Sequence, residues 1–134
     1  MTRRDISPPQ GGTPPPAVSR DSAGREIELR PLAKEICRRY RTEFPDEEER
    51  YGEAGNAWCV HDNLHILNWA FLDTAHGNVL NQQVRWLGRV LAAREFPVER
   101  LARDLELAAD VVRTDHPDVA AALERATGSV EVPL

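Results

Sequence analysis

The stretch NAWCVHDNLHILNWAFL, residues 56–72, decides the fold, because apolar side chains occupy every side of its helical wheel. A helix of this kind belongs at the centre of a small domain, since it has no face to give to water. Asn56 is a natural N-cap, and Gly52 and Gly55 loosen the backbone just before it. We therefore expect a buried central helix that runs from Asn56 to about Asp73.

Amphipathic stripes flank this segment on both sides. Leu29, Leu32 and Ile36 open the first stripe, which Pro45 ends, and the acidic run that follows is typical of a short, solvated helix. Further stripes predict helices over 79–94, 98–112 and 117–125, and short loops favour antiparallel neighbours. No stretch alternates between apolar and polar residues, so no sheet is expected. The prediction is an all-α fold: an antiparallel helical bundle of four principal helices with short flanking helices.

Proline and glycine mark the ends of the domain. Five of the ten prolines fall within residues 1–24, in SPP and TPPP, and no apolar periodicity accompanies them. This composition predicts a disordered, proline-rich tail over 1–24. The helical bundle domain is then expected over 25–126, and a frayed C-terminal tail over 127–134.

Charge and hydropathy exclude several classes of protein. The net charge of −5 argues against binding to nucleic-acid phosphates. No segment has the roughly 20 apolar residues of a membrane span, and no apolar run follows Arg3 and Arg4 to form a signal peptide. We expect a cytoplasmic protein without membrane or nucleic-acid partners. Cys37 and Cys59 fall within helical apolar patterns, which favours free thiols over a disulfide.

His61 and His65 form the sharpest chemical feature of the sequence. They are one helical turn apart, so both imidazoles leave one face of the central helix, as in histidine pairs that share a metal ion. The other histidines, His76 and His116, lie near predicted helix ends, and further ligands are scarce. The leading interpretation is structural: one histidine is a hydrogen-bonded core residue and the other lies at the edge of the buried face.

The same helix offers a second use for these histidines. A buried imidazole in a helical bundle is a typical axial ligand of haem, and Trp58 and Trp69 would then be apolar walls around the ring. His61, His65, Trp58 and Trp69 are the candidate cofactor-binding residues, and His61 and His65 the candidate metal ligands. Because tryptophans at helical spacing more often pack helices together, no cofactor is expected under the leading interpretation.

Patterns typical of enzymes are missing from the sequence. There is no G-x-S-x-G turn, no glycine-rich phosphate loop and no Cys-His motif. Asp62 stands where a zinc-protease helix has glutamate after its first histidine. We expect no catalytic residues.

The segments HDNLHILNWAF, residues 61–71, and VRWLGRVLAAREFPVERLARDLELAADVV, residues 84–112, carry a family resemblance. They resemble the helical sensory or interaction module found beside cobalamin-binding domains in bacterial regulators, over residues 57–113. The matching positions are His65, Ile66, Trp69, Ala70, Val84, Trp86, Leu87, Val90, Leu91, Arg94 and Pro97. Glu95 stands where that module usually has glycine. The cobalamin-ligating motif D-x-H-x-x-G is absent, so the resemblance implies the module's role and leaves its ligand open.

Together these observations predict a non-enzymatic bacterial regulatory or protein-interaction module. The expected partner is another protein, and the wide apolar stripes with three tryptophans favour a homodimer. The alternative is a metal-, haem- or tetrapyrrole-binding sensor built on the His61/His65 helix.

Overall fold

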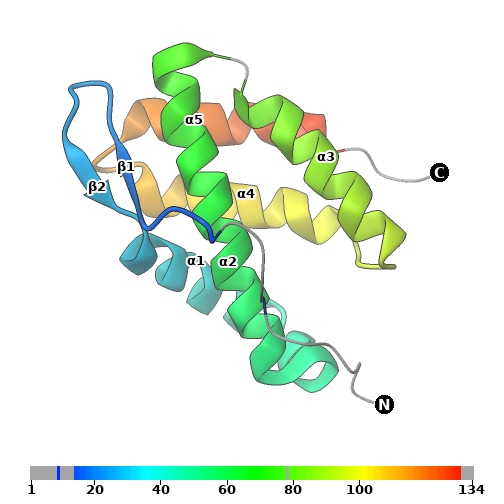
Figure 1. Ribbon diagram of the computed structural model, residues 1–134. Helices are drawn as coiled ribbons and strands as arrows, with labels where there is room; N and C mark the ends of the chain where they lie inside the picture. Colours follow the sequence, from blue (N-terminus) through cyan, green and yellow to red (C-terminus); the bar gives the residue numbers. More distant parts are fainter. Residues whose placement is uncertain (1–8, 10–13, 78, 131–134) are drawn as a thin grey trace.

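The computed structural model of the protein describes residues 9, 14–77 and 79–130. Most of this chain is helical, which confirms the expected all-α class (Figure 1). The elements in order are β1 (Val18–Arg20), β2 (Glu26–Glu28), α1 (Arg30–Glu43), α2 (Asp46–His76), α3 (Val79–Ala93), α4 (Glu99–Val112), α5 (Pro117–Ala126) and a 3₁₀ turn, η1 (Thr127–Ser129). The last three α-helices begin and end within two residues of their expected positions, because apolar periodicity and proline fix them locally.

The central helix, α2, is longer than expected. It is interrupted at Gly52, whose φ of 63° and ψ of −152° are accessible mainly to glycine, so the short acidic helix and the central helix meet there. The expectation that Asn56 caps the central helix is therefore wrong, since the helix already includes Gly55. A side chain at Gly55 would clash with the Tyr51 side chain, because its Cβ would lie 2.4 Å from that of Tyr51.

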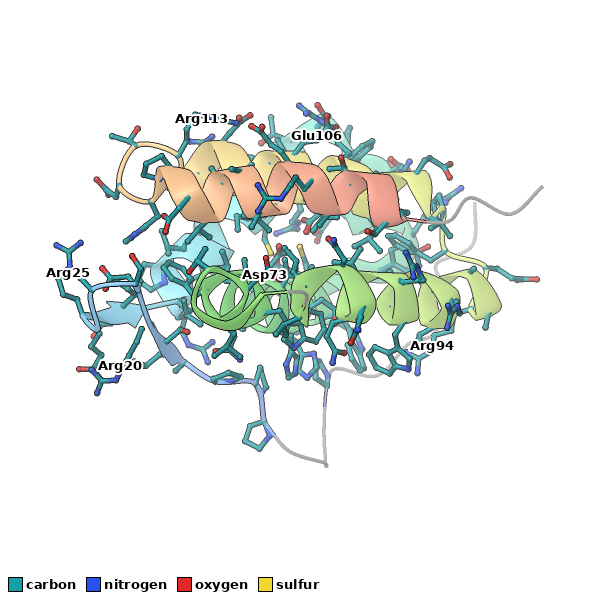
Figure 2. All side chains as sticks on the ribbon, turned by 90° about the horizontal axis from the view of Figure 1, so that it is seen from above. Arg20, Arg25, Asp73, Arg94, Glu106 and Arg113 are labelled. Carbon is teal, nitrogen blue, oxygen red and sulfur yellow. The ribbon has the colours of Figure 1, made fainter. Side chains whose placement is uncertain are left out.

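The turn between α2 and α3 is built by Asp73 (Figure 2). Its Oδ1 accepts hydrogen bonds from the backbone N–H groups of Val79 and Leu80, at 2.9 and 3.2 Å, and so caps the start of α3. The backbone N–H of Gly77 donates to the Asp73 carbonyl, at 2.7 Å, and closes α2.

A small antiparallel sheet corrects the expectation that no sheet is present. Strand β1 pairs with β2, with Ser19 opposite Ile27, and it lies inside the segment expected to be a disordered tail. Three-residue strands are too short to show a period-two pattern. The turn between them is held by Asp21, whose Oδ1 accepts from the N–H groups of Ala23 and Arg25. Residues 1–8 and 10–13 of the expected tail over 1–24 lie outside the described residues, as do residues 131–134 of the expected C-terminal tail.

Helices α2 to α5 pack in two layers. Figure 2 shows α2 and α3 in one layer and α4 and α5 in the other, and Figure 1 shows α2 crossing obliquely in front of α4 and α5. Helices α4 and α5 run side by side in opposite directions, whereas α2 and α3 diverge from their connection. Fully buried side chains fill the space between the layers, among them Leu67 and Phe71 of α2, Leu105 of α4 and Leu123 of α5. No helix in the described part of the chain is long and apolar enough to cross a membrane.

The turn between α3 and α4 contains a strained residue. Glu95 adopts a φ of 61°, a left-handed conformation that favours glycine over residues with a Cβ. This is the position where the resembled module usually has glycine.

Candidate functional site

Four aromatic side chains follow one another along α2. Trp58, His61, His65 and Trp69 are three or four residues apart, so they share one side of the helix. Successive ring centroids lie 5.1, 5.0 and 5.6 Å apart; the first two pairs meet edge to face and the last pair is stacked. We call these four residues the ring ladder. It brings together all four candidate cofactor-binding residues of the sequence.

The ring ladder borders a groove of about 930 Å³. One wall is α2, the other is α3 with Trp86, Leu87 and Val90, and Leu101 and Asp104 of α4 lie at the floor. Its lining residues come mainly from α2, α3 and α4. Figure 1 shows α2 and α3 diverging from their connection, with α4 behind them. Trp86 is 53% exposed, so a large apolar ring stands free at the rim.

The histidines differ from the expected structural arrangement. Neither His61 nor His65 is buried in the core, because both lie half-buried along the groove. Nδ1 of His61 lies 3.3 Å from Oδ1 of Asp62. Partial burial and the neighbouring His61 lower the pKa of His65, against an opposing effect of Asp62. This lowered pKa favours the neutral imidazole of His65.

The His61/His65 pair stands without a third metal ligand in the described chain. No group of three or more His, Cys, Asp or Glu side chains is arranged there to hold a metal ion. His116 is directed elsewhere, since its ring packs edge to face on Phe71 with centroids 5.0 Å apart. The candidate metal ligands thus supply two imidazoles to the groove.

At the groove floor lies a buried polar pair that the sequence analysis missed. Asn63 is 2% and Asp104 6% exposed, and Nδ2 of Asn63 donates to Oδ1 of Asp104 at 3.1 Å. Burial raises the pKa of Asp104 to about 7; the bond from Asn63 opposes the shift and the charge of Asp62 adds to it. One feature of the sequence points to this buried carboxylate: Asp104 falls on the apolar stripe of α4, between Leu101 and Leu105.

The amide of Asn63 is only partly satisfied. Its Nδ2 also donates to the backbone carbonyl of Cys59, at 3.0 Å, and lies near the thiols of Cys59 and Cys37, at 3.5 and 3.7 Å. Its Oδ1 has no hydrogen-bond partner among the described residues. Both cysteines are free thiols, as expected. The contact with Cys37, together with burial, raises the pKa of Cys59 well above its ordinary value.

A second buried polar cluster lies at the end of the groove. Glu47, only 8% exposed, accepts hydrogen bonds from the Tyr40 hydroxyl at 2.5 Å and from Nη1 of Arg100 at 2.8 Å. Arg100 also bonds to Asp46 and lies 4.4 Å above the Phe44 ring. We call Tyr40, Glu47 and Arg100 the closed network. It corrects the expectation that the acidic run forms a solvated helix, because this run anchors α2 to α1 and α4.

Positive charge reaches the groove through Arg94, at the end of α3 (Figure 2). Its guanidinium lies 5.9 Å from the centroid of the Trp58 ring, within the range of a cation–π contact. The site therefore combines aromatic walls, an arginine near its rim and buried acceptors at its floor. Comparison with family models, with curated proteins and with solved structures found no match for this chain.

Proposed function

We propose that this protein is a non-enzymatic regulatory domain of the bacterial cytoplasm, which binds a flat, largely apolar organic ligand in the groove. The observation that carries the proposal is the ring ladder along one wall of a groove of about 930 Å³. A volume of this size falls within the range of small-molecule sites, which are mostly apolar with a few placed polar groups.

The shape of the ligand follows from the ring ladder. Trp58 and Trp69 are half-buried and Trp86 is exposed, so their rings leave apolar surface at the groove. A planar ring that covers this surface gains the burial energy and the stacking contacts that aromatic pairs favour. The walls suit a flat ligand better than a branched or strongly charged one.

The non-enzymatic assignment is supported by the low reactivity of the Cys59 thiol, which lines the groove. A raised pKa keeps the Cys59 thiol protonated, and a protonated thiol is a poor nucleophile. We therefore assign the groove to recognition, which agrees with the sensory role implied by the family resemblance.

All three tryptophans lie along the groove, so intrinsic fluorescence reports on this site. The test is a titration of the protein with planar aromatic probes, followed by tryptophan quenching and by calorimetry. His65→Ala should weaken binding several-fold, whereas the matched variant His116→Ala, outside the groove, should leave it unchanged. Absence of saturable quenching by every planar probe would overturn the proposal.

A tetrapyrrole is the second candidate, because the lowered pKa of His65 favours the neutral imidazole that ligates metals. Haem added to the protein would then give a Soret band that His65→Ala shifts. If the spectrum is the same with and without protein, this candidate fails.

We also propose that the same apolar surface binds a protein partner, which includes a second copy of this chain. The observation in its favour is the exposed ring of Trp86 at the rim. Light scattering at high micromolar concentration tests it: a dimer that Trp86→Glu converts to a monomer would support it, and a monomeric mass throughout would exclude a homodimer.

A further inference from the structure

The polar pair at the groove floor has more acceptors than donors. Asp104 receives one hydrogen bond from the described residues, from Asn63, and Oδ1 of Asn63 receives none. A buried acceptor without a partner costs about 1–3 kcal/mol, and a buried carboxylate costs more. Two apolar side chains at these positions would therefore destabilise the folded protein less than Asn63 and Asp104 do.

The closed network shows that this chain satisfies buried carboxylates elsewhere. Glu47 is as deeply buried as Asp104 and accepts hydrogen bonds from two side chains, at 2.5 and 2.8 Å. The shortage of hydrogen-bond donors at Asp104 is therefore confined to the groove floor.

The position of the pair specifies how a ligand would meet it. Asp104 lies on α4, between the wall formed by α2 and the wall formed by α3. A planar ligand that enters between these walls has its faces toward apolar and aromatic side chains, and its leading edge toward Asp104. That edge must donate hydrogen bonds, because the floor offers acceptors.

We propose that the ligand is a planar nitrogen heterocycle of the aminopyrimidine or aminoquinoline class, which presents a ring N–H and an exocyclic amino group to the carboxylate of Asp104. Two parallel N–H donors match the two oxygens of a carboxylate, and charge assistance strengthens such a pair. This inference rests on the proposed function, since it names the ligand of the same groove.

The chemistry of the floor agrees with a ligand that carries a proton. Burial holds the pKa of Asp104 near 7, so the carboxyl group and a weakly basic ring nitrogen are able to share one proton. Asp62 of α2 adds negative charge nearby, whereas the cations at the groove are otherwise engaged: Arg100 with Asp46 and Glu47, and Arg94 against Trp58.

The test compares two probes that differ in one group. 2-Aminoquinoline has the ring nitrogen and the amino donor, and 2-methylquinoline replaces that donor by a methyl group of similar size. We expect wild-type protein to bind 2-aminoquinoline about tenfold more tightly, by tryptophan quenching and calorimetry, since tenfold corresponds to 1.4 kcal/mol. Asp104→Asn should reduce this preference to less than threefold.

Glu106→Gln provides the matched control, because Glu106 lies on the same helix, exposed on the side away from α2 and α3 (Figure 2). It should keep the full preference. Equal affinity of wild-type protein for both probes would overturn this inference and leave the proposed function standing. A preference that survives in a folded Asp104→Asn variant would also overturn it. If neither probe binds, and no other planar probe does, the proposed function fails together with this inference.

Discussion

Two polar clusters join α2 to α4, and they differ in how completely their hydrogen bonds are satisfied. In the closed network, Glu47 accepts from Tyr40 and Arg100, and the spare donors of Arg100 reach Asp46. In the Asn63–Asp104 pair, the Asp104 carboxylate accepts one side-chain hydrogen bond, from Asn63, and the amide oxygen of Asn63 has no partner in the described chain. Burial alone therefore does not mark a functional site in this protein. We propose that the surplus of acceptors does, because it lies at the floor of the groove.

Removal of Arg100 should have the largest effect on stability. Arg100→Met leaves Glu47 as a buried carboxylate without its cation, and the loss of one partner of a buried pair costs about 3 kcal/mol or more. Urea unfolding monitored by circular dichroism measures this change. Arg103→Met is the matched control on the same helix, since its ion pair with Glu43 is well exposed and should contribute less than about 1 kcal/mol. Equal losses in the two variants would show that the closed network contributes little.

Asp104→Asn should act in the opposite direction. The folded-state pKa of Asp104, about 7, lies above its ordinary value of 3.8, so the unfolded chain releases this proton first as the pH rises. The contribution of this group to stability is complete below pH 3.8 and declines until the pH passes about 7. Each pKa unit corresponds to about 1.4 kcal/mol, so Asp104→Asn should stabilise the protein by at least about 1 kcal/mol at pH 8.

The measurement is the difference in unfolding free energy between wild type and Asp104→Asn, from urea titrations at pH 5, 6, 7 and 8. The gain should grow with pH and level off above pH 7. A gain that is independent of pH would contradict the assignment of the titration to Asp104.

Tyr40→Phe should have a smaller effect than Arg100→Met. It removes one of the two donors to Glu47 and keeps the packing of the ring, which lies 4.9 Å from that of Phe44. We expect a loss of about 1 kcal/mol, because Arg100 still pairs with the carboxylate. Thermal unfolding of Tyr40→Phe beside Arg100→Met measures the ratio of the two effects, and a loss as large as that of Arg100→Met would mean that the hydroxyl organises the whole network.

His61→Ala and His65→Ala should have the smallest effects on stability, each within about 0.5 kcal/mol. Both side chains are half-buried at the groove, and the contact of His61 with Asp62 is long, at 3.3 Å. The two substitutions should instead weaken the binding of the proposed ligand. A loss of more than 2 kcal/mol in either variant would return that histidine to the structural role expected from the sequence.

The ring ladder could be predicted from the sequence, whereas the groove floor could not. Trp58, His61, His65 and Trp69 share a face because of helical periodicity alone. Asp104 is separated from Asn63 by 41 positions, and no local pattern pairs them. The β1–β2 hairpin was missed for a different reason: its strands are too short to show a period.

By itself, the sequence determined the helices that lie between prolines and glycines, and the side of α2 on which the aromatic rings gather. Both depend on contacts within a few residues, and the 3.6-residue repeat records these directly. Only the tertiary structure decided that α2 and α3 diverge over α4, that Arg100 meets Glu47 across 53 positions, and that Asp104 lies at the floor of the groove with too few donors. These features arise from the packing of distant helices, because whether a buried polar group is satisfied depends on which side chains the fold places around it.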